Sequence, residues 1–95
     1  MMNPLRVKYF EKLPRDVYEQ NQRNLVQLYQ EELRRVLGGE RAIEVFSYSF
    51  RRTLLSYKIL IRVYPNAPHQ GSVIIIGEEG KKLLREIEKE EGKEE

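Results

Sequence analysis

The stretch from residue 14 to residue 37 favours an α-helix, because from Leu25 onward its apolar residues recur at a spacing of three and four positions that places them along one side of a helix. Pro14 suits the first turn of a helix, and Asp16 puts a negative charge near the positive end of the helix dipole. Gly38 and Gly39 then supply the left-handed residue with which many helices end. The sequence therefore predicts one long helix over this stretch. Its apolar side consists of Leu25, Leu28, Tyr29, Leu33, Val36 and Leu37.

Four other stretches favour β-strands. Residues 5–10 alternate apolar and basic side chains, and residues 43–50 are rich in β-branched and aromatic side chains. Residues 54–64 alternate more regularly, and residues 72–76 are almost entirely apolar. A tight turn at 51–53 would join the second and third of these strands. In the third strand we expect one face to pack on the helices and the other to face outward. The inward set is Leu55, Tyr57, Ile59, Ile61 and Val63, and the outward set includes Lys58, Leu60, Arg62 and Tyr64.

A second helix is predicted from Glu78 to Glu90, with Leu83, Leu84 and Ile87 as its apolar side. The order β-α-β-β-β-α indicates an α+β fold. We expect a three- to four-stranded, mainly antiparallel sheet with a long N-terminal helix and a short C-terminal helix. The length predicts one domain over 1–90, followed by a disordered charged tail over 91–95.

The composition excludes several kinds of site. The chain has no cysteine, so disulfides, thiolate metal sites and thiol catalysis are excluded. The single histidine, His69, lies in a proline-containing loop without an evident acid partner, which is typical of a surface residue. Residues 77–82 lack the spacing and the Lys-Ser/Thr ending of a phosphate-binding loop. We therefore expect no enzymatic activity, no cofactor and no metal site.

No apolar run approaches the roughly 18 residues needed to cross a bilayer, and the N-terminus lacks the apolar core of a secretory signal. Together with the absence of cysteine, this favours a cytoplasmic protein with no membrane partner. The absence of cysteine and tryptophan beside many charged residues is also typical of thermophile proteins. The size suits a small accessory protein of a virus or mobile element.

Charge is distributed unevenly along the chain. The net charge is only +2, but residues 1–76 hold 12 basic and 7 acidic residues, whereas residues 77–95 hold 5 basic and 8 acidic ones. No acidic residue lies between Glu44 and Glu78. On the predicted sheet, this acid-free stretch would form a basic face that contains tyrosines.

A basic face with exposed tyrosines predicts nucleic-acid binding, because cations neutralise phosphates and tyrosines stack on unpaired bases. We expect a small DNA- or RNA-binding protein, for which a regulatory role is one option. A second basic group at the start of the last helix would add phosphate contacts. The candidate residues are Tyr48, Arg51, Arg52, Lys58, Arg62, Tyr64, Lys81 and Lys82.

Two alternatives remain open at the level of the sequence. Strands often carry Lys and Arg on a solvated face that has no function beyond preventing aggregation. The outward positions also include Leu54 and Leu60, and apolar side chains on an outer face favour contact with another protein or with a second copy of the chain. The alternative function is therefore a protein-interaction or dimerisation module, or an inhibitor of a partner protein.

The predicted topology from 15 to 91 resembles that of a double-stranded-RNA-binding domain. In that family, lysines at the start of the last helix contact phosphates across a groove, and the resemblance implies this role for Lys81 and Lys82. Pro68 and His69 likewise resemble the Pro-x-His loop of the family.

Overall fold

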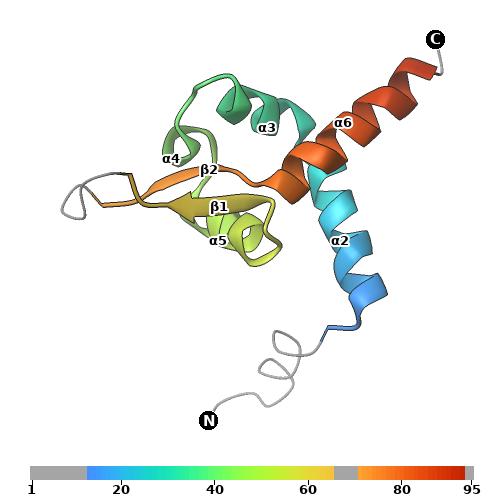
Figure 1. Ribbon diagram of the computed structural model, residues 1–95, viewed down its shortest axis with the longest axis horizontal. Coiled ribbons are helices and arrows are strands. Elements are labelled where there is room, and N and C mark those ends of the chain that lie inside the picture. The colour runs from blue at the N-terminus through green and yellow to red at the C-terminus, as the bar shows by residue number, and fades with distance from the viewer. Residues whose placement is uncertain (1–12, 66–70, 94–95) are drawn as a thin grey trace.

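The computed structural model describes residues 13–65 and 71–93, and helices dominate this part of the chain (Figure 1). Among these residues there are five helices and one sheet, which has two antiparallel strands. The prediction of a three- to four-stranded sheet is therefore wrong, and the strand expected at 5–10 lies outside the described residues. The elements are α2 (Arg15–Leu28), α3 (Gln30–Leu37), α4 (Ala42–Val45), α5 (Tyr48–Ser56), β1 (Leu60–Val63), β2 (Val73–Ile76) and α6 (Glu78–Lys93).

The predicted long helix is present as α2 and α3, because the chain bends at Tyr29. The backbone of Tyr29 has φ −110° and ψ 29°, although its N–H still donates to the carbonyl of Leu25 at 3.0 Å. Its ring packs edge-on against Phe46 and Phe50, with ring centroids 6.1 and 5.2 Å apart. We attribute the bend to this aromatic packing, which fixes α3 against the segment that follows it.

The strand predicted over 43–50 is wrong, since these residues form α4 and the start of α5. Ser47 is the N-cap of α5, and its hydroxyl accepts a hydrogen bond from the N–H of Phe50 at 3.4 Å. Phe46, Phe50 and Leu54 recur every four residues, and the side chains of Phe46 and Leu54 are buried. A cap and a helical repeat thus prevail over the β-propensity of aromatic and β-branched residues.

Helices α3 and α5 both end with a left-handed residue and a Schellman hydrogen-bond pair. At the end of α3 the left-handed residue is Gly39, with φ +116°, which confirms the predicted cap. At the end of α5 it is Lys58, with φ +57°. There the N–H of Ile59 donates to the carbonyl of Leu54, and the N–H of Lys58 donates to that of Leu55, both at 3.0 Å. Lys58 therefore ends a helix and does not lie in a strand.

Replacing Lys58 by glycine is expected to stabilise the protein by about 0.5–1 kcal/mol. A left-handed residue with a Cβ costs about 1–2 kcal/mol, of which the greater freedom of glycine in the unfolded chain cancels part. The measurement is the urea midpoint at unchanged slope. Lys58→Ala is the control, because alanine keeps the Cβ. Equal stabilisation by both variants would contradict the assignment.

Strands β1 and β2 pair so that Leu60 faces Ile76, and Arg62 faces Ile74. Leu60 and Ile76 are buried, at 0% and 3% exposure. The predicted facing of this strand is therefore wrong, because Leu60 points into the core and Ile61 lies on the opposite side. The turn at Lys58 explains the difference, since the alternation of the strand begins only after it.

The start of α6 lies very close to the chain just before β1. The N–H of Gly77 donates to the carbonyl of Ile59 at 2.9 Å. A Cβ on Gly80 would lie 2.6 Å from the same carbonyl oxygen, and a Cβ on Gly77 would lie 2.8 Å from that of Lys58. Both positions require glycine because backbone atoms occupy the space that a side chain would need.

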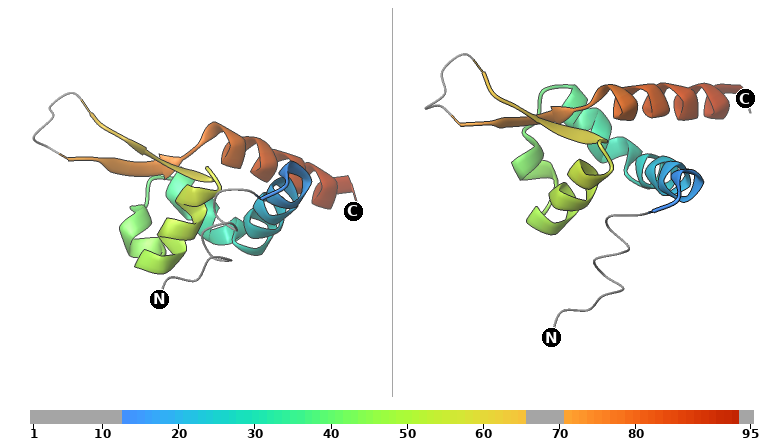
Figure 2. Two further views of the ribbon diagram at one scale, coloured as in Figure 1. Left: turned by 90° about the horizontal axis from the view of Figure 1, so that it is seen from below. Right: turned by 60° about the horizontal axis from the view of Figure 1, so that its bottom comes forward.

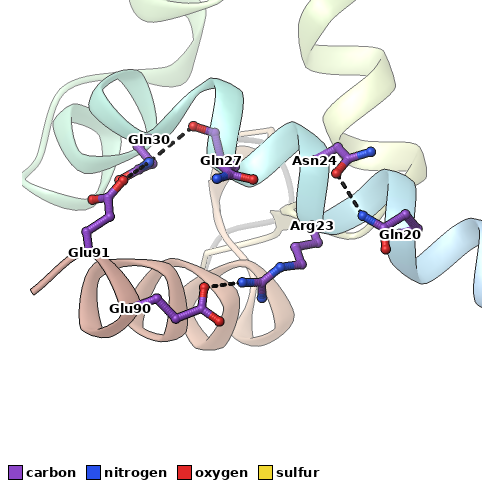
Figure 3. Close-up of polar contacts among 7 residues, drawn as sticks. All are labelled: Gln20, Arg23, Asn24, Gln27, Gln30, Glu90 and Glu91. Atoms are coloured by element: carbon purple, nitrogen blue, oxygen red, sulfur yellow. Dashed lines mark hydrogen bonds and ion pairs between the residues drawn. The ribbon is translucent and has the colours of Figure 1, made fainter. Parts of the chain in front are cut away.

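Helix α6 packs along α2 and α3 through a row of polar contacts (Figure 3). Arg23 forms an ion pair with Glu90, and the side-chain amide of Gln30 donates to Glu91 at 2.9 Å. A further ion pair joins Arg34 and Glu88 at 2.7 Å. The helix reaches Lys93, so the tail that was expected to be disordered from residue 91 is helical to that point.

The core lies between the sheet and the helices, and α6 and β1–β2 extend in opposite directions from it (Figure 2). None of the helices in the described part of the chain is long and apolar enough to span a membrane. The buried apolar residues are Val26, Leu33, Val36, Ala42, Phe46, Leu54, Ile59, Leu60, Ile76, Leu84 and Ile87.

Candidate nucleic-acid interface

One side of α5 is exposed and entirely polar. Ser49, Arg52, Thr53 and Ser56 follow the spacing i, i+3, i+4, i+7 and are all exposed, whereas Leu54 on the opposite side is buried. The hydroxyl of Thr53 donates to the carbonyl of Ser49 at 3.1 Å, and that of Ser56 donates to the carbonyl of Thr53 at 2.7 Å. The hydroxyl oxygens therefore keep lone pairs that can accept hydrogen bonds from a partner.

Three predicted site residues lie together in the first turns of α5. The Cζ atoms of Arg51 and Arg52 lie 5.8 and 5.9 Å from the centre of the Tyr48 ring, within cation–π range. The Tyr48 side chain is 67% exposed. The N-terminal end of α5 therefore presents an aromatic ring and two guanidinium groups in one place, on a helix rather than at a hairpin tip.

Two more predicted residues lie on the hairpin, and one residue that sequence reasoning missed joins them. Arg62 is exposed in β1, and Tyr64, just after it, is 71% exposed. Arg62 and Arg51 line the same cleft as Arg41, which is the N-cap residue of α4. Arg41 was overlooked because it precedes Glu44, outside the acid-free stretch. Its position two residues after Gly39, the left-handed residue at the end of α3, was the available signal.

The other predicted residues lie apart from this group. Lys58 borders a groove with Tyr18 and Glu79, and Lys82 borders a second groove beside Glu79 and Glu86. Lys81 forms an ion pair with Glu78 at 3.6 Å. Burial, together with the nearby Glu79 carboxylate, raises the pKa of Tyr18 above its ordinary value. This side of the molecule is thus mixed in charge, and the structure does not bring Lys58, Lys81 and Lys82 to the arginines of α5.

The outer side of the hairpin differs from the basic face that the sequence predicted. Its described side chains are all apolar, with Val73 48% and Ile75 38% exposed beside the half-buried Ile61 and Val63. A stacking platform of tyrosines and cations is therefore absent from the described strands. Pro68 and His69 lie outside the described residues. In the described part of the chain no cluster of three or more His, Cys, Asp or Glu side chains could hold a metal ion.

Comparison of the chain with models of known protein families, with curated proteins and with solved structures finds no match.

Proposed function

We propose that the protein binds double-stranded DNA without catalysing a reaction, and that α5 enters the major groove. The observation that carries this proposal is the exposed polar side of α5, with Ser49, Arg52, Thr53 and Ser56. Helices α4 and α5 follow each other with only Phe46 and Ser47 between them. In helix-turn-helix proteins the second of two such helices lies in the major groove while the first crosses the backbone.

The chemistry of this side suits a reader of base edges. Arginine donates to the O6 and N7 atoms of guanine, and serine and threonine bond to several bases. An α-helix is about 10–12 Å wide with its side chains and fits a major groove about 12 Å wide. Arg52 is the cation on this exposed side, so it is the residue that we expect to contribute most to recognition.

The surroundings of α5 suit contact with the phosphate backbone. No acidic residue occurs between Glu44 and Glu78, so nothing in this stretch repels phosphate. The exposed hydroxyl groups of Tyr48 and Tyr64 can bond to phosphates on either side of the groove. We expect a steep loss of affinity as salt rises from about 50 to 200 mM, as counterion release requires.

Arg52→Ala is expected to weaken binding about tenfold, the loss typical of one arginine contact to a base or a phosphate. Because the target sequence is unknown, a binding duplex is first selected from a pool of random sequences. Fluorescence anisotropy then compares the variants on this duplex and on an unrelated one. A base contact predicts a larger loss on the selected duplex, and a phosphate contact predicts equal losses and a smaller salt slope.

Lys82→Ala is the matched control, because it removes the same charge from the mixed-charge side of the molecule. It should change the affinity less than twofold. If both variants weaken binding equally, net charge and not α5 governs the affinity. If no duplex is bound and the protein forms dimers in light scattering, the alternative of protein association through the apolar side of the hairpin replaces this proposal.

A further inference from the structure

A cleft of about 390 Å³ lies between β2, the segment that leads into α4, and the side chains of Arg51 and Arg62. Figure 1 shows α4 beside β2 at this place. The cleft lies within the size range of small-molecule sites, about 300–1,000 Å³. Its lining includes Glu40, Arg41, Ile43, Arg51, Arg62 and Ile74.

The lining combines apolar walls with three cations. Ile43 is 58% exposed and Val73 is 48% exposed, and Ile74 is half-buried. Arg41, Arg51 and Arg62 all line the same space. Placing several positive charges in one cleft is unfavourable unless an anion or water compensates them.

The described residues do not provide that compensation. In this part of the chain, no carboxylate forms an ion pair with Arg41, Arg51 or Arg62. The one acidic residue of the lining, Glu40, accepts hydrogen bonds from the Nε and Nη2 atoms of Arg35 at 2.9 and 2.8 Å. These bonds lower the pKa of Glu40, so its carboxylate stays ionised and remains paired with Arg35.

The guanidinium of Arg51 is held in place. Its Nη1 atom donates to the carbonyl of Phe46 at 2.7 Å, in the turn between α4 and α5. Among the described residues, its other N–H groups donate no hydrogen bond, so they can bind an anion. A fixed arginine loses less conformational freedom on binding than a mobile one, and this favours a ligand at this position.

We propose that the cleft binds a small organic anion with a carboxylate or phosphate head and an apolar body about the size of one ring. The head meets the guanidinium groups of Arg41, Arg51 and Arg62, which bind oxyanions through paired hydrogen bonds. The body covers Ile43 and Ile74. A phosphate of the DNA backbone would satisfy the charges but would leave these apolar walls exposed, so this site is separate from the DNA-reading side of α5.

The test is a titration of the ¹⁵N-labelled chain, without DNA, by two-dimensional NMR. Phenyl phosphate is the probe that has both head and ring, inorganic phosphate has only the charge, and benzyl alcohol has only the ring. We expect phenyl phosphate to shift the amides of Gly39, Ala42, Ile74 and Ile75 in a saturable way. Inorganic phosphate and benzyl alcohol should each bind at least about tenfold more weakly, since each lacks one of the two contacts.

The variants Arg41→Gln and Arg62→Gln should each weaken phenyl phosphate binding about tenfold, which corresponds to one lost charge-assisted hydrogen bond. Arg85→Gln makes the same charge change on the exposed side of α6, outside the cleft, and should alter binding less than twofold. Arg41 and Arg62 are exposed, so the spectra of their variants should remain those of the folded protein, and either variant alone tests the site. The proposal is overturned if the cleft amides do not shift, if inorganic phosphate binds as tightly, or if Arg85→Gln weakens binding equally.

Discussion

Leu60→Ala is expected to reduce the free energy of unfolding by about 2–5 kcal/mol, the range for a leucine removed from a close-packed core. The Leu60 side chain is fully buried and lies opposite Ile76, which is also buried. The lost methyl groups leave a cavity that the two short strands cannot close without moving away from α5. Urea unfolding followed by circular dichroism measures the loss.

Ile75→Ala is the matched control for this prediction. Ile75 lies in the sheet on the opposite side from Leu60 and is 38% exposed. The Ile75→Ala substitution should therefore reduce the free energy of unfolding by less than half as much as Leu60→Ala does, although it removes a similar side-chain volume. Equal losses, or a larger loss at Ile75, would mean that the strands face the other way, as the alternation from Leu55 to Val63 had suggested.

Gly80→Ala is expected to destabilise the protein by about 2 kcal/mol, although alanine is the better helix former. The new Cβ would lie 2.6 Å from the carbonyl oxygen of Ile59 and 3.2 Å from its Cα. Overpacking of this kind costs about 1–3 kcal/mol, and this close approach to backbone atoms places it at the upper end. About 1 kcal/mol of improved helix propensity offsets part of the cost.

Gly92 lies in the same helix and provides the control, since a Cβ at that position would meet nothing within 4 Å. Gly92→Ala should be neutral or stabilising by up to about 1 kcal/mol through helix propensity alone. The two substitutions, identical in chemistry, should therefore differ by about 2–3 kcal/mol in urea unfolding. If Gly80→Ala stabilises the protein as much as Gly92→Ala does, α6 does not approach Ile59 as closely as described.

Several elements could be predicted from the sequence because the patterns that indicate them lie within the element itself or directly beside it. Helix α6, strand β2 and the end of α3 at Gly39 agree with the apolar spacing and the glycine signals. The middle of the chain could not be predicted in this way. From Phe46 to Phe50 aromatic residues alternate with serines in a strand-like pattern, but the cap at Ser47 and the packing of Phe46 against Tyr29 favour a helix. The contact with Tyr29 is distant in sequence, and strand patterns do not carry that information.

Because residues 43–50 were predicted as a strand and form helices, the candidate site also differs from the predicted one. Tyr48, Arg51 and Arg52 were predicted as interface residues, and the structure places these three side chains together. Ser49 and Thr53 were missed, because their shared side exists only on a helix. Arg41 was missed because it lies outside the acid-free stretch. That it lines the same cleft as Arg62 depends on how α4 packs beside β2, which is a tertiary contact.

The packing of α6 along α2 has a consequence for the order in which the chain folds. Leu84 and Ile87 are almost fully buried, and they come from the last helix, whereas Val26 comes from the first described one. During synthesis, the side of α2 that faces α6 therefore stays uncovered until residue 87 has left the ribosome. Such late closure leaves a nascent chain exposed to aggregation and favours its capture by chaperones.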